Sequence, residues 1–509
     1  MRIIRPVEFD PSEGSFARAS TGTYFDKDGV LRTAAADEPR WNYTFEDGEW
    51  VGPELLAEGQ RTNLLKYSED FGNSAWQKAA ACVVTPNTAM SPDGNLSADS
   101  IKSTGTSASD NRSQQFVTLA VTAGTVLTFS VWLRADSPVT TTLRLANQSD
   151  GDGENVLVTL TSTWARFTVT RVFTASTPAV RACINSQSAA VTVYAWGAQL
   201  EVGDRPSSYI PTTSTQVTRA ADIPGRIITN VPENDAPVWE AGTYDQGTKR
   251  IQNHHVYEVL AETTTDSPAA GLVKTPPTWL DLGVTNPWRA FDEKIGTVTT
   301  NPEAIRFSIR ADQTINALAF FGVDAGSIRV TVTDPSLGRV FEYEATPVST
   351  DGIDNWYQYL FAPIELVEDF VVLDVPAGTY GTIDISLDKP GGEAKLGALV
   401  LGQTSTLGVA LYGTSIRLRD FSRKERDDFG NFVIQERDFS KVAEFDVAVD
   451  TANIGAVQRT VAKYRAKPVV WIGEESYEST IIYGFCTDFG VSISGPTISD
   501  ATFSVEGLN

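Results

Sequence analysis

Six aromatic residues have a type and spacing that could place flat rings beside polar side chains. Aromatic rings stack on the apolar faces of pyranose rings, while neighbouring polar groups bind the sugar hydroxyls. These rings therefore predict contact with a glycan, and the open alternative is that they fill a core or pack beneath a neighbouring subunit. The six candidates are Trp132, Trp164, Trp196, Tyr244, Tyr257 and Trp279.

Alternation along the segment FSVWLR (129–134) assigns Trp132 to one face of a strand. Phe129 and Val131 share one face, whereas Trp132 shares the other with Ser130 and Arg134. If the Phe129 face forms the core, Trp132 points outward and can meet a ligand or a partner.

Catalytic chemistry has few candidate residues. A Ser–His–Asp or Cys–His site needs a histidine, and the chain has only two, His254 and His255. Adjacent residues on a strand point to opposite faces. Nucleophile-elbow, phosphate-loop and dinucleotide-binding motifs are absent. We therefore expect no enzyme, although a glycosidase stays open because it needs only two carboxylates and 64 acidic residues are present.

The turn SPDGNLSADS offers oxygen ligands around a glycine, from Asp93, Asn95 and Asp99. Ca²⁺ takes six to eight oxygen ligands in proteins, so this turn is a candidate calcium site, with a solvated turn as the alternative. No other cofactor is expected. The three cysteines are far apart in sequence and predict three buried or half-buried thiols, not a metal site or a disulfide framework.

The charge balance excludes two classes of partner. The 41 basic and 64 acidic residues give a formal net charge of −23. A nucleic-acid binder needs a basic face, and so does a protein that docks on anionic lipid. The sequence also has no apolar run of the roughly 18 residues that would span a bilayer, so neither nucleic acid nor membrane insertion is expected.

The elements that must position these residues are overwhelmingly β. Short alternating runs rich in β-branched and aromatic residues are separated by Gly, Asp, Asn, Ser and Pro. One helix is predicted, over residues 451–467, where Ile454, Val457, Val461 and Tyr464 form one apolar stripe. Asp450 or Thr451 is expected to cap it. The predicted fold is mainly β, with antiparallel β-sandwiches of jelly-roll type and a small C-terminal α+β part.

Shifts in composition divide the chain into five predicted segments. They are an extended N-terminal arm (1–60), a jelly roll (61–222), a connector with a small aromatic module (223–298), a second β-sandwich (299–405) and a C-terminal assembly or attachment domain (406–509).

Several stretches resemble a cassette common in tail and prophage proteins of tailed bacteriophages. They are FARASTGTYFDKDGVLRTAAADEPRW (16–41), LLAEGQRTNLLKYSEDFGNSAW (55–76), SPDGNLSADSIK (91–102), FSVWLRA (129–135) and YAWGAQLEVGDRPSSYIPTTSTQVTRAAD (194–222). The resemblance implies a virion protein with a carbohydrate-binding-type jelly roll over about 220 residues, and it leaves the sugar open.

A second stretch, WEAGTYDQGTKRIQNHHVYEVL with PPTWLDLG (239–283), resembles a chitin-binding-type aromatic module. The motif positions fall on Tyr244, Gly247, Tyr257 and Trp279, and Arg250 stands where the module usually has an apolar residue. The stretches TNPWRAFDEKIGT (285–297), RDFSRKERDDFGN (419–431) and VEGLN (505–509) resemble phage tail-tip or baseplate-associated proteins.

Together these features predict a structural component of a phage tail, at the tip, baseplate or collar, that contributes to host adsorption by binding a surface glycan. The expected partners are other tail proteins, a host surface polysaccharide and further copies of the chain. The expected location is the virion tail after synthesis in the host cytoplasm. The alternatives are a purely structural assembly protein and a glycan-degrading tail enzyme.

Overall fold

The computed structural model describes residues 1–149, 153–185, 190–349, 353–361, 365–378, 381–426 and 432–508. The chain divides into two compact units. Residues Phe16–Pro224 form one, here called the jelly-roll unit, and Met1–Ser15 with Gly225–Asn509 form the other, here called the C-terminal unit.

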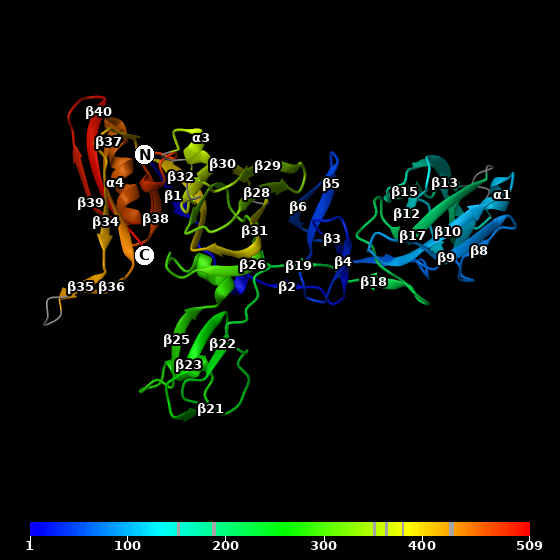
Figure 1. Ribbon diagram of the computed structural model, residues 1–509, viewed down its shortest axis with the longest axis horizontal. Helices are drawn as coiled ribbons and strands as arrows, with labels where there is room; N and C mark the ends of the chain where they lie inside the picture. The colour runs from blue at the N-terminus through cyan, green and yellow to red at the C-terminus, as the bar shows by residue number, and fades with distance from the viewer. Residues whose placement is uncertain are drawn as a thin grey trace. The chain divides into compact units, whose positions relative to one another are not determined.

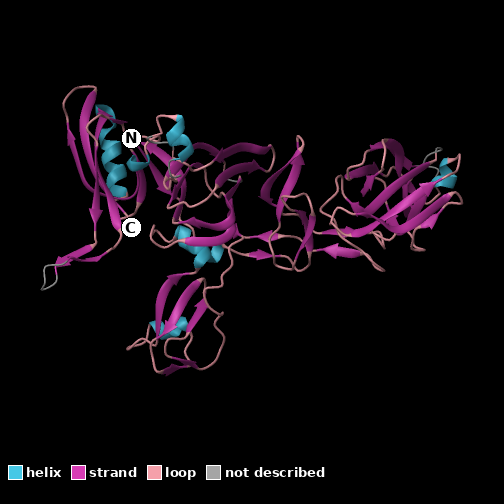
Figure 2. Cartoon of the chain, viewed as in Figure 1, coloured by secondary structure: helices cyan, strands magenta, loops and turns pink. Residues whose placement is uncertain are grey.

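Strands dominate both units, and helices are few and short (Figure 2). The named strands of each sheet pair in antiparallel fashion throughout the described residues. This confirms the predicted class, mainly β with antiparallel sandwiches and a small C-terminal α+β part.

The jelly-roll unit contains two five-stranded sheets (Figure 1). The first has the order β15 (Ala165–Val172), β12 (Val126–Arg134), β17 (Val191–Val202), β10 (Leu96–Ser103) and β9 (Cys82–Met90). The second has the order β14 (Gly153–Leu160), β13 (Val139–Asn147), β16 (Thr177–Ile184), β11 (Ser113–Val121) and β8 (Gln77–Lys78), with the short helix α1 (Ala108–Asn111) before β11.

The core of this unit lies between the two sheets. Phe129 and Val131 of β12 are fully buried there with Leu143 of β13 and Val180 of β16. Trp132 lies on the opposite face of β12, in a separate cluster with Trp196. The alternation in FSVWLR therefore assigned the two faces of this strand correctly.

Short paired strands complete the jelly-roll unit. They are the hairpins β3 (Gly22–Phe25) with β4 (Leu31–Ala34) and β5 (Trp41–Glu46) with β6 (Glu49–Leu55), and the pairs β7 (Arg61–Asn63) with β18 (Val217–Arg219) and β2 (Phe16–Ala17) with β19 (Ile223–Pro224). Phe25 and Leu31 of the first hairpin pack on Trp132, Trp196 and Tyr209. The outer face of the first sheet is thus covered by the N-terminal hairpins.

Buried ion pairs join the two ends of this unit. Asp222 accepts hydrogen bonds from Arg18 Nη1 at 3.1 Å and Arg40 Nη2 at 2.6 Å, and its side chain is fully buried. Glu58 pairs with Arg40 at 2.9 Å and with Arg219 at 3.3 Å. These five residues, here called the arginine network, all lie in the stretches that resemble the phage cassette or directly beside them.

The C-terminal unit contains two larger sheets. One has the order β20 (Ile227–Thr229), β26 (Thr299–Arg310), β31 (Thr382–Leu396), β28 (Ser327–Asp334) and β29 (Gly338–Ala345). The other has ten strands, in the order β30 (Phe370–Ala377), β27 (Ile315–Phe321), β32 (Ala398–Thr406), β1 (Arg2–Pro6), β38 (Val469–Ile472), β39 (Ile481–Ser492), β40 (Ile498–Gly507), β37 (Phe439–Asp450) and β33 (Val409–Ala410), with β34 (Ser415–Asp420) also on β37.

Strand β1 joins two parts of the ten-stranded sheet, because it pairs with β32 on one side and β38 on the other. Ile3 and Ile4 are both buried, as expected for a central strand covered on both faces. Residues 1–60 therefore contribute to both units, and the sheet draws on three of the five segments predicted from composition. The segment boundaries themselves stay a prediction.

The predicted C-terminal helix is present as α4 (Ile454–Lys463), after the 3₁₀ turn η3 (Thr451–Asn453). The Asp450 carboxylate accepts a hydrogen bond from the Ala452 amide at 3.0 Å, so Asp450 caps the 3₁₀ turn that leads into α4. The predicted apolar stripe packs on the cluster that contains Phe445 and Phe503. No helix in the described ranges is long and apolar enough to cross a membrane.

The remaining elements of this unit are short. They are the three-stranded sheet β22 (Lys249–Gln252), β23 (His255–Val259) and β25 (Trp279–Val284), the pairs β21 (Tyr244–Asp245) with β24 (Thr263–Thr264) and β35 (Arg423–Arg426) with β36 (Phe432–Gln435), the helices α2 (Pro268–Leu272) and α3 (Trp356–Phe361), and the 3₁₀ turns η1 (Pro11–Glu13), η2 (Asn286–Phe291) and η4 (Glu478–Thr480).

The three cysteines are free thiols. Cys82 and Cys183 are buried and Cys486 is half-buried, as predicted. Burial raises the pKa of each thiol to about 11, so all three stay protonated at neutral pH.

Candidate functional site

A groove of about 790 Å³ lies between the N-terminal hairpins and the outer face of the first sheet in the jelly-roll unit. Its walls come from β3, β5, β6, β12, the β9–β10 turn and the start of β15. The aromatic side chains that line it are Phe25, Tyr43, Phe45, Trp50, Trp132 and Trp164. We call it the aromatic groove.

Four rings form a continuous row from the surface to the interior. The centroids of Phe45 and Trp50 are 5.3 Å apart, those of Trp50 and Phe25 are 5.0 Å apart, and those of Phe25 and Trp132 are 6.4 Å apart. Phe45 is 59% exposed at the outer end, and Trp132 is 4% exposed at the inner end. The row therefore offers ring surface to a ligand at one end and is anchored in the protein at the other.

Glycines position two of these rings. Gly29 has φ of 72°, and a Cβ atom there would lie 2.3 Å from Cε2 of Trp50. Gly197 has φ of 65°, and its Cβ would lie 2.8 Å from Cε3 of Trp132. Both sites need a residue that tolerates the left-handed region and leaves room for an indole ring.

Trp164 forms another wall of the groove and is half-buried. Its Nε1 donates to the Met90 carbonyl at 2.8 Å, which ties β15 to the end of β9. The Arg134 guanidinium lies 5.5 Å from the Trp164 ring centroid and 4.3 Å from that of Tyr194. The ring is thus held in place by one hydrogen bond and one cation–π contact.

Arg166 places a positive charge at the inner end of the groove. Its guanidinium lies 4.4 Å from the Trp132 ring centroid, and Nη1 donates to the Ser207 carbonyl at 2.6 Å. Nε and Nη2 are closed off from solvent and have no hydrogen-bond partner among the described residues. Burial lowers the pKa of Arg166 to about 10, so the side chain is charged at neutral pH.

This combination suits a sugar better than it suits a reacting group. Ring faces bind the apolar side of a pyranose, and the buried Arg166 guanidinium adds a positive charge behind Trp132. Asp93, in the β9–β10 turn beside the groove, accepts from the Ser91 hydroxyl at 2.5 Å and from the Asn95 amide at 3.0 Å. The groove therefore has the features of a binding surface.

The structure brings three of the predicted rings to this region. Trp164 and Trp132 line the groove, and Trp196 lies behind Trp132 with its centroid 5.6 Å away. Trp196 is 1% exposed, and its Nε1 donates to the Ser97 hydroxyl at 3.1 Å. No free ring face is left on Trp196, so we assign it to the packing beneath the groove instead of to ligand contact.

The other three predicted rings lie together in the C-terminal unit. Tyr257 and Trp279 are buried in one small cluster, with half-buried Tyr244 packed on it. Trp279 is fully buried, and its Nε1 donates to the Asp266 carbonyl at 3.1 Å. Arg250 lies 4.7 Å from the Tyr244 ring centroid. Because this module is small, its rings serve as its core, and Trp279 has no surface to offer a sugar.

The three residues of the candidate calcium turn make different hydrogen bonds. Asp93 and Asn95 hydrogen-bond each other, whereas Asp99 is buried and accepts from the Phe71 and Asn87 amides at 2.8 and 3.0 Å. Burial raises the pKa of Asp99, although these amides oppose the rise. Within the described residues, no three His, Cys, Asp or Glu side chains are grouped to hold a metal ion.

The sequence reading missed Tyr43, Phe45 and Trp50, which it placed in an extended arm. The signal was present, because residues 41, 43 and 45 are aromatic and alternate along one strand. Arg166 gave no signal, since only the fold brings it over Trp132.

Comparisons with known proteins give weak likenesses. No family model and no curated protein matches the chain. It is similar to a domain of bacteriophage CBA120 tailspike protein 4, with 11% identity over 28% of this chain and 21% of that one, at a TM-score of 0.23. It thus spans about a fifth of that protein.

Two further likenesses are to parts of Xyn10C from Paenibacillus barcinonensis. The CBM22-1 xylan-binding domain matches with 11% identity over 30% of this chain and all of that one, at a TM-score of 0.22. The CBM22-1–CBM22-2 tandem matches with 11% identity over 68% of this chain and 98% of that one, at a TM-score of 0.23. Such low scores establish neither a family nor a function.

Proposed function

We propose that this protein is a structural component of a tailed-phage tail that binds a host surface glycan through the aromatic groove. The observation that carries the proposal is the row of rings from exposed Phe45 through Trp50 and Phe25 to buried Trp132. The exposed outer end of the row offers a sugar ring an apolar surface, and the buried inner end holds that surface in place, which keeps the entropic cost of binding low.

The tail assignment rests on the resemblance of residues 16–222 to the phage cassette. The arginine network lies in the same stretches, and its ion pairs hold the hairpins that form the groove. Several copies on a symmetric tail would raise the avidity of a weak single site, since each further contact becomes intramolecular.

An assembly role for the C-terminal unit has its own support. Leu418 on β34 and Phe432, Val433 and Ile434 on β36 are each between 57% and 66% exposed. Figure 1 shows β35 and β36 extending from the end of the ten-stranded sheet. Exposed apolar strands of this kind favour contact with other tail proteins or further copies of the chain. A purely structural protein would use only this surface.

The test measures binding of the full chain to host cells and to the same cells stripped of surface polysaccharide, with released reducing sugar assayed in the same tube. We expect saccharide-dependent binding without sugar release. Release of sugar would make the glycan-degrading alternative the better account. Equal binding to both kinds of cell, or none, would contradict glycan recognition.

A further inference from the structure

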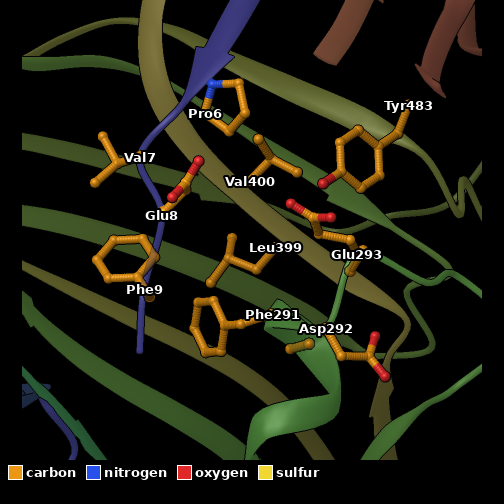
Figure 3. Close-up of a pocket in the computed structure, with 12 residues that line it drawn as sticks. Pro6, Val7, Glu8, Phe9, Phe291, Asp292, Glu293, Leu399, Val400 and Tyr483 are labelled. Atoms are coloured by element: carbon orange, nitrogen blue, oxygen red, sulfur yellow. The ribbon is translucent and has the colours of Figure 1, made fainter. Parts of the chain in front are cut away.

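A second pocket lies in the C-terminal unit and belongs to no function assigned above (Figure 3). Its volume is about 330 Å³, and its walls come from the chain after β1, the end of η2, the start of β32 and one residue of β39. All of these segments lie within one unit, so the pocket does not depend on how the two units are placed.

Apolar side chains make up part of the pocket lining, beside exposed polar atoms. Leu399 and Val400 of β32 are 3% and 4% exposed, and both side chains lie in the middle of the pocket in Figure 3. Phe9 and Phe291 flank them with ring centroids 5.5 Å apart. This surface suits a short hydrocarbon chain.

Tyr483 supplies an unused polar group on the opposite side. The residue is 4% exposed, and its ring stacks on Phe321 with centroids 5.6 Å apart. Its hydroxyl points into the pocket (Figure 3), where no described residue hydrogen-bonds it. Burial, together with the carboxylates of Glu293 and Asp292, raises the pKa of Tyr483, so the hydroxyl stays protonated and offers its lone pairs to a donor.

Glu293 lies at the mouth of the pocket, and its carboxylate faces the same space as the Tyr483 hydroxyl (Figure 3). Its backbone has φ of 61°, a conformation that non-glycine residues rarely adopt. Among the described residues it forms no ion pair. The strained backbone holds an unpaired carboxylate beside an unpaired hydroxyl.

The neighbouring acids are already satisfied. Glu8 pairs with Lys467 at 2.5 Å. Asp292 accepts from the Thr297 hydroxyl at 2.8 Å and from the Lys294 amide at 3.0 Å, and its carboxylate points away from Tyr483 in Figure 3. The Lys467 ammonium also attracts Glu293, but its ion pair is with Glu8, so Glu293 is the carboxylate left for a ligand.

We propose that this pocket binds a primary alkylammonium ion. The ammonium would donate hydrogen bonds to the Glu293 carboxylate and the Tyr483 hydroxyl, and its alkyl chain would lie on Leu399, Val400 and Phe291. The inference is independent of the glycan proposal, because it uses other residues in the other unit.

The test titrates the full chain with n-butylammonium chloride and, separately, with 1-butanol, its neutral counterpart, followed by saturation-transfer NMR on the ligand methyl group. Butyltrimethylammonium, which has the charge but no donor, is a third probe. We expect n-butylammonium to bind at least about tenfold more tightly than 1-butanol, because both can donate a hydrogen bond to Glu293 but only the ammonium also brings a positive charge to the carboxylate. Butyltrimethylammonium should fall between them.

Three variants distinguish binding of n-butylammonium in this pocket from its general attraction to a protein with a net negative charge. Glu293→Gln should weaken n-butylammonium binding at least about fivefold, and Tyr483→Phe should weaken it while keeping the ring on Phe321. Glu262→Gln removes an exposed acid elsewhere in the same unit and should leave binding unchanged. Equal binding of n-butylammonium and 1-butanol, or equal effects of the Glu293 and Glu262 substitutions, would overturn the proposal.

Discussion

At the scale of single residues, the aromatic groove depends on small neighbours that leave room for large rings. Gly29 contacts the Trp50 indole so closely that any side chain would displace it, and its positive φ adds a second constraint. Gly48, in the turn of the next hairpin, has φ of 97° but open space where a Cβ would lie. A substitution at Gly29 would therefore strain the backbone and displace the Trp50 ring, whereas a substitution at Gly48 would only strain the backbone.

Gly29→Ala should weaken glycan retention and lower the free energy of unfolding by about 1–3 kcal/mol, because it strains the backbone and moves Trp50. Gly48→Ala should lower the free energy of unfolding through backbone strain alone and leave glycan retention unchanged. Glycan affinity electrophoresis and thermal unfolding of both variants check this. Equal loss of retention in the two would show that Trp50 is not a ligand contact.

The residues of the groove were predictable only in part. Alternation identified the face on which Trp132 lies, yet a face pattern cannot tell whether another segment covers that face. The burial of Trp196 and Trp279 could therefore not be predicted from the sequence. Phe45 and Trp50 were missed because sequence alone does not show that this hairpin lies beside Phe25, which packs on Trp132 of a distant strand.

At the scale of elements, the arginine network fixes the N-terminal hairpins to the rest of the jelly-roll unit. Arg18, Arg40 and Arg219 converge on Asp222, and all four side chains are at most 1% exposed. Removal of one partner from buried ion pairs leaves uncompensated charge, which typically costs 3–5 kcal/mol. The network is therefore sensitive to loss of its shared carboxylate.

Asp222→Asn should lower the free energy of unfolding of the jelly-roll unit by about 3–5 kcal/mol. Asp204→Asn is the matched control, because Asp204 is 72% exposed in its pair with Arg205 and should change stability by less than about 1 kcal/mol. Chemical denaturation with tryptophan fluorescence measures both. A loss below about 1 kcal/mol for Asp222→Asn would refute the role given to the network.

The network also predicts a pH dependence. Burial raises the pKa of Glu58, but Arg219, Ser208 and Arg40 outweigh it and hold the pKa below the ordinary value. The stabilisation from Glu58 is therefore complete above its unfolded pKa of about 4.3 and is lost as pH falls through the lower folded value. The gap in melting temperature between the wild type and Glu58→Gln should shrink from pH 6 to pH 3. A constant gap would contradict this sign.

Elements with strong local patterns were predictable, and elements that depend on distant partners were not. Strand β12 and helix α4 follow from period-two and helical patterns, and Asp450 was one of two named caps. The pairing of β1 with β32 and β38 joins residues about 400 or more positions apart. Local periodicity in the sequence cannot predict such a pairing. The same holds for Arg166 above Trp132.

At the scale of the whole molecule, the jelly-roll unit begins and ends at one place. Phe16 and Ala17 of β2 pair with Ile223 and Pro224 of β19, and Arg18 binds Asp222 just inside this pair. The unit has its own core and its own groove. A fragment of residues 16–224 should therefore fold alone and unfold in a single cooperative transition, measured by circular dichroism. A fragment without cooperative unfolding would mean that the unit needs the rest of the chain.

The most direct test of glycan recognition is the affinity of this fragment for isolated host surface polysaccharide, compared with Phe45→Ala, Trp50→Ala and Leu157→Ala. Leu157 is a 68% exposed apolar residue on β14, away from the groove, and serves as the control. We predict that the fragment binds as tightly per site as the full chain. Trp50→Ala should lose about 2 kcal/mol, roughly 30-fold in affinity, with a smaller loss for Phe45→Ala and none for Leu157→Ala. A full chain that binds while its fragment does not, or a Trp50→Ala fragment that binds normally, would contradict the account.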